Sequence, residues 1–261
     1  MFFSSEFMFD DIRNKDMGVI LVSLEKDILL QHSLLYKVNP IIDISQKSIE
    51  GYLYGVENSS PETIDLTLAL VDNAGNPRAW TIKERNKIFS WMVQDDFKPF
   101  ISEDDNEVIY YLKCIGVKKE FNSNLQGLVT FTMQPSSPYA YTPIVEHKYY
   151  NTIGKTNGIT IDNISNIDKY YYPSIHIYNY DNTGKIEIIN NNTQQKFTLE
   201  NLEIGEEIIV DMQMKHIFSS IGHNRLKDSN MNWIGLIKGN NNISFNGEAE
   251  FNIKCQFPML V

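Results

Sequence analysis

Alternating apolar and polar residues dominate the chain, and this period of two is typical of half-buried β-strands. Near the C-terminus, residues 249–257 carry apolar side chains at every odd position and polar side chains at every even one. The same rhythm recurs in residues 64–70, 108–114, 175–177, 186–188, 197–199 and 208–212. Turn-forming Asn and Gly residues separate several of these runs, as at residues 181–184 and 246–247. We therefore predict a mainly β protein.

One segment breaks this rhythm and predicts an α-helix. Thr81 and Glu84 have the spacing of a capping box, in which each side chain binds a free backbone amide of the other residue. Behind the box, one helix face gathers apolar side chains, with Ile82 on roughly the same face, namely Ile88, Phe89, Met92 and Val93. The helix should end before Pro99. A second, shorter helical patch is predicted at residues 214–220.

A proline-rich stretch divides the chain into two predicted domains. Pro135, Pro138 and Pro143 lie close together and resist both helix and central strand. We therefore expect an N-terminal domain over residues 1–143, which contains the helix, and a C-terminal domain over residues 144–261. The second domain is almost all predicted strand, and its length of about 118 residues suits a single β-sandwich.

Charge and cysteine content narrow the functional classes. The chain has 261 residues with 23 Lys+Arg against 33 Asp+Glu, and its net charge of -10 argues against nucleic-acid binding. Cys114 and Cys255 are too few for a disulfide framework or a structural zinc site, and both lie on apolar strand faces as core residues. The first eleven residues lack the pattern of a signal peptide, and no run reaches the length of a membrane span. We expect synthesis in a cytosol and no membrane span.

The sequence contains no recognisable catalytic constellation. Phosphate-binding glycine loops and the G-x-S-x-G, H-E-x-x-H and C-x-x-C motifs do not occur. The carboxylates at residues 95–96 and 103–105 fit a solvated turn better than an acid–base pair. His216 and His223 have no partner at the spacing of a catalytic triad. We therefore expect no enzyme activity, no metal site and no cofactor.

Clustered tyrosines are the candidate contact residues. Tyr170, Tyr171 and Tyr172, together with residues 149–150 and Tyr178, could stack on sugar rings, because a tyrosine offers an apolar face and a hydroxyl group. Aromatic residues are also common in sandwich cores and at subunit interfaces, which is the more ordinary interpretation. A glycan and a partner protein both remain open as ligands of Tyr170, Tyr171 and Tyr172.

The order of the segments resembles the distal tail proteins of long-tailed bacteriophages, and the resemblance covers nearly the whole chain. The helix around Trp91 is similar to a conserved element of that family, although Met92 stands where the family has leucine. The other matching segments are residues 16–18, 64–71, 100–104, 110–111, 128–133, 137–141, 205–211 and 236–243.

This resemblance implies a fold and a function. The N-terminal domain (1–143) would be a β-rich belt with one α-helix, and the C-terminal domain (144–261) a galectin-like β-sandwich. Members form hexameric rings that join the tail tube protein to the tail-associated hub protein and the host-adhesion apparatus. A receptor-binding protein or a host glycan would be a further partner. The protein would be assembled in the host bacterial cytoplasm and end in the virion, at the tail tip. The alternatives are a carbohydrate-binding module and, from another class, a cell-wall hydrolase.

Overall fold

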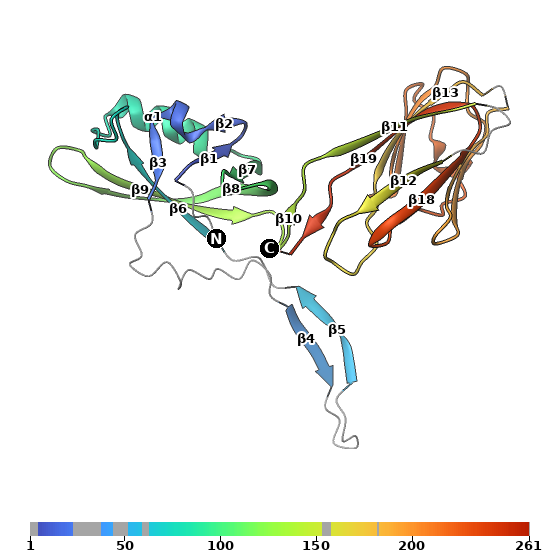
Figure 1. Ribbon diagram of the computed structural model, residues 1–261, viewed down its shortest axis with the longest axis horizontal. Coiled ribbons are helices and arrows are strands. Elements are labelled where there is room, and N and C mark those ends of the chain that lie inside the picture. The colour runs from blue at the N-terminus through green and yellow to red at the C-terminus, as the bar shows by residue number, and fades with distance from the viewer. Residues whose placement is uncertain are drawn as a thin grey trace. The chain divides into compact units, whose positions relative to one another are not determined.

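The computed structural model describes residues 5–22, 38–43, 52–58, 63–152, 158–181 and 183–260, and for 38–43 and 52–58 it describes the backbone alone. The chain forms two compact units, one of residues 1–141 with 260–261 and one of residues 142–259 (Figure 1). Each unit has its own hydrophobic core. The mainly β fold class predicted from the alternating pattern is confirmed, with a β-rich first unit that carries one helix and a β-sandwich as the second.

The N-terminal unit is built on one antiparallel sheet with the strand order β2-β1-β7-β8-β9-β6-β3. Its strands are β1 (Phe7–Phe9), β2 (Ile12–Arg13), β3 (Val19–Leu21), β6 (Ile64–Leu70), β7 (Lys98–Ser102), β8 (Asp105–Phe121) and β9 (Gly127–Pro135), and β10 (Ala140–Tyr141) pairs with β8. A short 3-10 helix, η1 (Asn14–Met17), lies between β2 and β3. Strands β4 (Val38–Asp43) and β5 (Tyr52–Asn58) pair with each other as a separate two-stranded sheet.

The predicted helix is present as α1 (Ile82–Met92). The hydroxyl of Thr81 accepts the backbone N–H of Glu84 at 3.3 Å, which confirms half of the capping box. The carboxylate of Glu84 does not return the bond and instead accepts Arg78 Nη2 at 2.8 Å. The predicted apolar face is also partly wrong. Ile82 is 69% exposed and Val93 47% exposed.

Trp91 completes the buried face of α1 together with Ile88 and Met92. The indole stacks on Phe7, with ring centroids 5.9 Å apart, and its Nε1 donates to the carbonyl of Phe9 at 2.8 Å. One side chain therefore connects the helix to strand β1. Among the described residues α1 is the only α-helix, and no described helix is long and apolar enough to cross a membrane.

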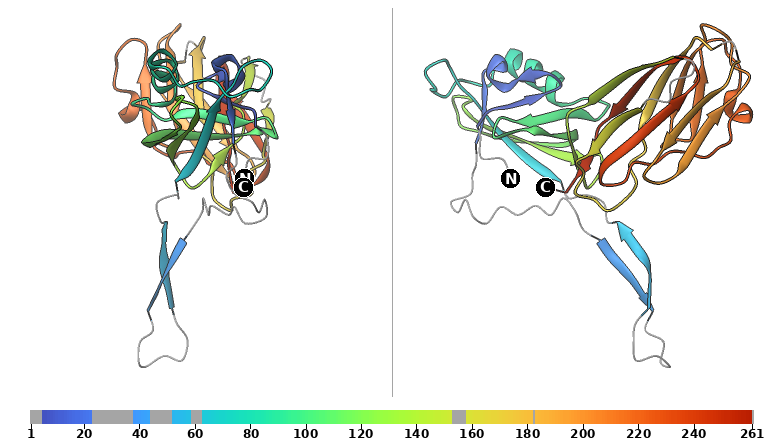
Figure 2. Two further views of the ribbon diagram at one scale, coloured as in Figure 1. Left: turned by 90° about the vertical axis from the view of Figure 1, so that its left-hand side faces the viewer. Right: turned by 45° about the vertical axis from the view of Figure 1, so that its right-hand side comes forward.

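The C-terminal unit is a sandwich of two antiparallel sheets (Figure 2). The five-stranded sheet has the order β11-β19-β13-β16-β17, and the four-stranded sheet has the order β12-β18-β14-β15. The bounds are β11 (Val145–Asn151), β12 (Gly158–Asn163), β13 (Ser174–Asn179), β14 (Ile186–Asn190), β15 (Gln195–Leu199), β16 (Glu207–Asp211), β17 (His216–Ser219), β18 (Gly239–Asn246) and β19 (Ala249–Cys255). The short strand β20 (Pro258–Met259) lies outside both of these sheets, and the 3-10 helix η2 spans Arg225–Asp228.

The core of the sandwich follows directly from the alternating sequence. Odd-numbered residues of β19 face inward from Ala249 to Cys255, and Phe251 meets Phe245 of β18 with ring centroids 4.3 Å apart. In β13 the inward residues are Ile175 and Ile177. The even-numbered residues of both strands therefore form the outer face of the five-stranded sheet, which a ligand or partner can reach.

The helical patch predicted at residues 214–220 is wrong. The chain there makes a turn, in which Asp211 Oδ1 accepts the N–H of Met214 at 2.8 Å and Lys215 adopts a φ of 55°. It then continues as strand β17, with Ile217 buried and Phe218 56% exposed. Pairing with β16 outweighs the weak helical pattern, because an amphipathic segment this short is equally consistent with a strand.

Candidate functional site

The structure separates the three consecutive tyrosines that the sequence put forward as contact residues. Tyr170 is 50% exposed, and its ring centroid lies 6.4 Å from that of the half-buried Tyr172. Tyr171 turns inward, where its ring meets Phe257 edge to face at 4.8 Å and its hydroxyl accepts the N–H of Gln256 at 2.9 Å. Burial raises the pKa of Tyr171 to about 12. Tyr170 and Tyr172 are thus accessible to a ligand, whereas Tyr171 mainly stabilises the fold.

A second tyrosine cluster lies at the other end of strand β13. It consists of Tyr150, Tyr178 and Tyr180, which we call the three-tyrosine cluster. Tyr180 is 4.8 Å from Tyr178 and 5.6 Å from Tyr150 between ring centroids. Tyr150 is 51% exposed and Tyr180 37% exposed. Tyr149, the neighbour of Tyr150, instead points inward and stacks on Phe245 at 5.0 Å.

Sequence reasoning placed Tyr150 and Tyr178 with the first group and missed Tyr180. The signal was nevertheless present, because Tyr178 and Tyr180 are two residues apart in an extended segment and therefore share a face. The pairing that brings Tyr150 next to them could not be read from the sequence. It depends on β19 lying between β11 and β13, so that Tyr150 and Tyr178 both pair with Glu250.

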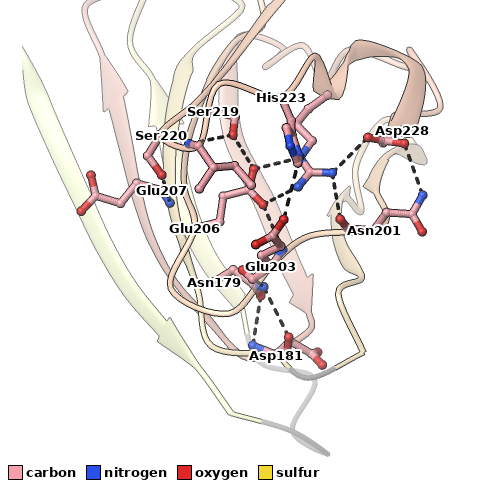
Figure 3. A network of polar contacts seen from close by, with 12 residues as sticks. Asn179, Asp181, Asn201, Glu203, Glu206, Glu207, Ser219, Ser220, His223 and Asp228 are labelled. Carbon is pink, nitrogen blue, oxygen red and sulfur yellow. Dashed lines mark hydrogen bonds and ion pairs between the residues drawn. The ribbon is translucent and has the colours of Figure 1, made fainter.

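A buried polar network supports the loops at this end of the sandwich (Figure 3). Arg225 of η2 donates from Nε and Nη2 to the two carboxylate oxygens of Glu206, both at 2.8 Å. Glu206 also accepts Ser219 Oγ at 2.6 Å and the N–H of Glu203 at 3.0 Å. Both charged side chains are almost fully buried, at 5% exposure for Arg225 and 0% for Glu206. The network fixes the positions of β17 and the loop before β16.

Arg225 extends the same network to a further loop. Its Nη1 donates to the carbonyl of Asn201 at 2.8 Å and to Asp228 Oδ2 at 3.2 Å. Burial alone would raise the pKa of Glu206, but the hydrogen bonds from Arg225, Ser219 and the Glu203 amide outweigh it and hold the pKa below the ordinary 4.5. A carboxylate that stays charged and fully paired is a structural element, because it has no free oxygen for a ligand.

A surface depression of about 380 Å³ lies beside this network. Strand β17 and the loop to η2 line it, with Lys215, His216, Phe218, His223 and Asn224 among the lining residues. Both histidines predicted to lack a catalytic role border it. His223 Nδ1 lies 3.9 Å from Glu203 Oε1, a long contact between two exposed side chains. Among the described residues, neither histidine is hydrogen-bonded to a hydroxyl or a thiol, so the lining of the depression shows no triad geometry.

The remaining chemical candidates lie apart from one another. Burial raises the pKa of Cys255 to about 12 and also raises the pKa of Cys114, so both thiols stay protonated. Glu103 faces Glu6 at the surface, and their contact raises the pKa of Glu103. In the described part of the chain, no group of three or more His, Cys, Asp or Glu side chains is arranged to hold a metal ion.

The N-terminal unit offers strand edges and exposed apolar side chains. Strands β2 and β3 are the outer strands of its sheet path, and the β4–β5 pair has two outer edges of its own. Ile82, Val93 and Phe97 are exposed at the two ends of α1, with Phe97 at 44%. Unpaired strand edges and exposed apolar side chains are features that subunit contacts normally cover.

Comparison with known proteins gives consistent matches along the whole chain. A family model described as a phage tail protein N-terminal domain matches residues 2–137, and one described as a phage tail C-terminal domain matches residues 139–255. An SPbeta prophage-derived uncharacterized protein, YomH of Bacillus subtilis strain 168, is 26% identical over 262 residues and covers 98% of both chains.

A solved structure shows the same fold. The crystal structure of the Dit protein of phage SPP1, described as a paradigm of the hub adsorption apparatus in phages that infect Gram-positive bacteria, matches with a TM-score of 0.63 and 13% identity. That match covers 97% of this chain and 98% of the SPP1 chain. The baseplate of phage P2 in its activated conformation contains a chain with a TM-score of 0.49 and 12% identity, over 95% of this chain and 97% of that one.

Proposed function

Because this chain belongs to the phage tail proteins, we propose that it forms a hexameric ring at the tail tip, between the tail tube protein and the tail-associated hub of the baseplate. The observation that carries the proposal is the match to SPP1 Dit over both units, since a partial match would leave the second unit unexplained. In this function the protein carries out no bond chemistry. It holds partners in fixed geometry, and contacts between subunits transmit receptor engagement to the tail.

The N-terminal unit is the proposed ring-forming domain, corresponding to residues 1–143. Its sheet ends in the short strands β2 and β3, and the β4–β5 pair is bonded in the described structure to itself alone. A closed ring covers such edges with the next copy, and soluble oligomers usually close symmetrically. The C-terminal unit, which contains most of the predicted domain of residues 144–261, would then carry the hub-side and adhesion partners on its outer surfaces.

Light scattering on the purified full chain tests the ring. We expect a mass of about six times that of one 30.2 kDa chain. Replacing residues 38–58 by a short Gly-Ser linker should shift the mass towards the single chain, because it removes the β4–β5 pair and its edges. A matched variant, Lys254→Ala in the C-terminal unit, should keep the ring mass. A full-length chain that stays monomeric at all concentrations would contradict the proposal.

Contact with a host glycan is the second candidate function, and the exposed ring of Tyr170 is the observation that favours it. Tyr170→Ala and Tyr172→Ala should each weaken binding on a glycan array by about fivefold, because each removes an aromatic face. Tyr171→Phe is the matched control. It keeps the ring and loses the bond to Gln256, so it should cost about 1 kcal/mol of stability and leave glycan binding unchanged. An array without any signal for the folded wild-type chain would exclude this candidate.

A further inference from the structure

The three-tyrosine cluster is a partly exposed aromatic surface, with Tyr150 51% and Tyr180 37% exposed. Tyr180 contacts Tyr150 at an interplanar angle of 62° and Tyr178 at 48°, so the rings are tilted against one another and form no flat platform. The inward-facing residues of the same strands already fill the core. Aromatic residues are enriched at the centres of protein interfaces and depleted elsewhere on protein surfaces.

Carboxylates surround the cluster. Tyr150 Oη donates to Glu248 Oε1 at 3.3 Å. Glu250 lies between Tyr150 and Tyr178 in the strand register, and Glu207 lies on the other side of Tyr178. Cross-strand partners share one face of a sheet, so Tyr150, Glu250, Tyr178 and Glu207 form one continuous row across four strands. The row contains no lysine or arginine.

The negative charge acts on the tyrosines themselves. Desolvation and the nearby carboxylate of Glu248 raise the pKa of Tyr150, and desolvation and Glu250 raise the pKa of Tyr180. Two lysines lie on the same outer face. Lys148 of β11 is one sheet row from Tyr150, and Lys254 of β19 is two rows away and is held by Glu146 at 3.2 Å. The carboxylates of Glu207, Glu248 and Glu250 outnumber the one neighbouring lysine, so the cluster is acidic as well as aromatic.

This combination selects a cation over a neutral sugar. Aromatic faces attract ammonium and guanidinium groups through their negative quadrupole, and neighbouring carboxylates accept the hydrogen bonds that such groups donate. A sugar ring instead stacks on an open aromatic face and needs donors as well as acceptors. The tilted rings present no single open face to a sugar, and the neighbouring carboxylates supply the acceptors and the negative charge that favour the cation.

We propose that the three-tyrosine cluster binds a lysine or arginine side chain on an exposed segment of a partner protein. The proposal rests on the docking role of the C-terminal unit and names the chemistry of the partner at that site. The side chain enters the angle between Tyr150 and Tyr180, and its charged group lies against Glu248 and Glu250.

Isothermal titration calorimetry on the full chain tests this with tetralysine and tetraarginine as probes. We expect saturable binding of both, and binding at least tenfold weaker for tetralysine acetylated on every side chain, because acetylation removes the charge. Glu248→Gln together with Glu250→Gln should weaken tetralysine binding about fivefold, and Tyr180→Leu about threefold. Glu146→Gln, at the far end of the same sheet, is the matched control and should change binding less than twofold.

Three results would overturn the proposal. They are equal binding of the acetylated probe, no binding of either cationic peptide, and a loss in Glu146→Gln as large as in the double variant. If tetralysine does not bind and maltose binds in a way that depends on Tyr180, the three-tyrosine cluster is a sugar site instead. Light scattering on the same samples keeps the two proposals apart. A monomer that binds tetralysine through Tyr180 contradicts the ring alone, and a ring without tetralysine binding contradicts the cation site alone.

Discussion

Replacement of Arg225 by alanine is expected to destabilise the C-terminal unit by about 3–5 kcal/mol. The guanidinium holds the carboxylate of Glu206, whose side chain is 0% exposed, through two bonds of 2.8 Å. Without it, a buried charge keeps only the donors Ser219 Oγ and the Glu203 amide. The free energy of unfolding, measured by urea titration at pH 7, reports the loss. The free energy of unfolding of Arg225→Lys should fall between those of the wild type and Arg225→Ala, because an ammonium group keeps the charge but cannot bind both carboxylate oxygens as a guanidinium does.

An exposed ion pair in the same unit supplies the control. Lys254 and Glu146 are 3.2 Å apart and 38% and 40% exposed, so Lys254→Ala should cost less than about 1 kcal/mol. The Arg225 effect also depends on pH. The pKa of Glu206 is lowered in the folded state, so its contribution is present above 4.5 and is lost as the pH falls through the folded value. The difference in the free energy of unfolding between the wild type and Arg225→Ala should therefore become smaller in acid. Equal losses for the two variants at pH 7 would show that the network is not structural.

The alternating pattern predicted much of the fold because a strand that is buried on one face has apolar residues at every second position. Residues 64–70 became β6 and residues 249–255 became β19, with the expected side chains inside. Strand order has no such pattern. Nothing in the local sequence places β19 between β11 and β13, since that order depends on pairing between residues 70 to 110 positions apart. The same limit explains the error at residues 214–220, where pairing with β16 decides the conformation.

The candidate site was predictable only in part for the same reason. Runs of tyrosine pointed to the correct unit, but the neighbours of Tyr150 were set by strand pairing. Buried charge was a second gap, because Glu206 and Arg225 are 19 residues apart and look like ordinary surface residues in the sequence. The resemblance to the phage tail family, in contrast, depended on short segments and on their order along the chain, and it is confirmed by the two family models.

Replacement of Trp91 by alanine is expected to destabilise the N-terminal unit by about 3–5 kcal/mol. The indole is 4% exposed and lies between α1 and strand β1. It stacks on Phe7 at an interplanar angle of 7°, meets Phe9 at 70°, and donates to the Phe9 carbonyl at 2.8 Å. Its removal opens a cavity and leaves that carbonyl without its donor. Trp91→Phe should cost less, because it restores most of the volume but not the hydrogen bond.

The Trp91→Ala variant also tests whether the two units unfold independently of each other. Each unit has its own cluster of buried side chains, so calorimetry should show one transition lowered and the other in place. Phe97→Ala is the control in the same unit. Phe97 is 44% exposed, so its replacement should change the free energy of unfolding by less than about 0.5 kcal/mol. Equal shifts of both transitions would mean that the units unfold together.

Since Trp91 fixes β1 to the helix, and β1 pairs with the edge strand β2, the same variant should also weaken the ring before the chain unfolds. A lowered assembly mass at a temperature where the fold is still intact would link this packing contact directly to assembly.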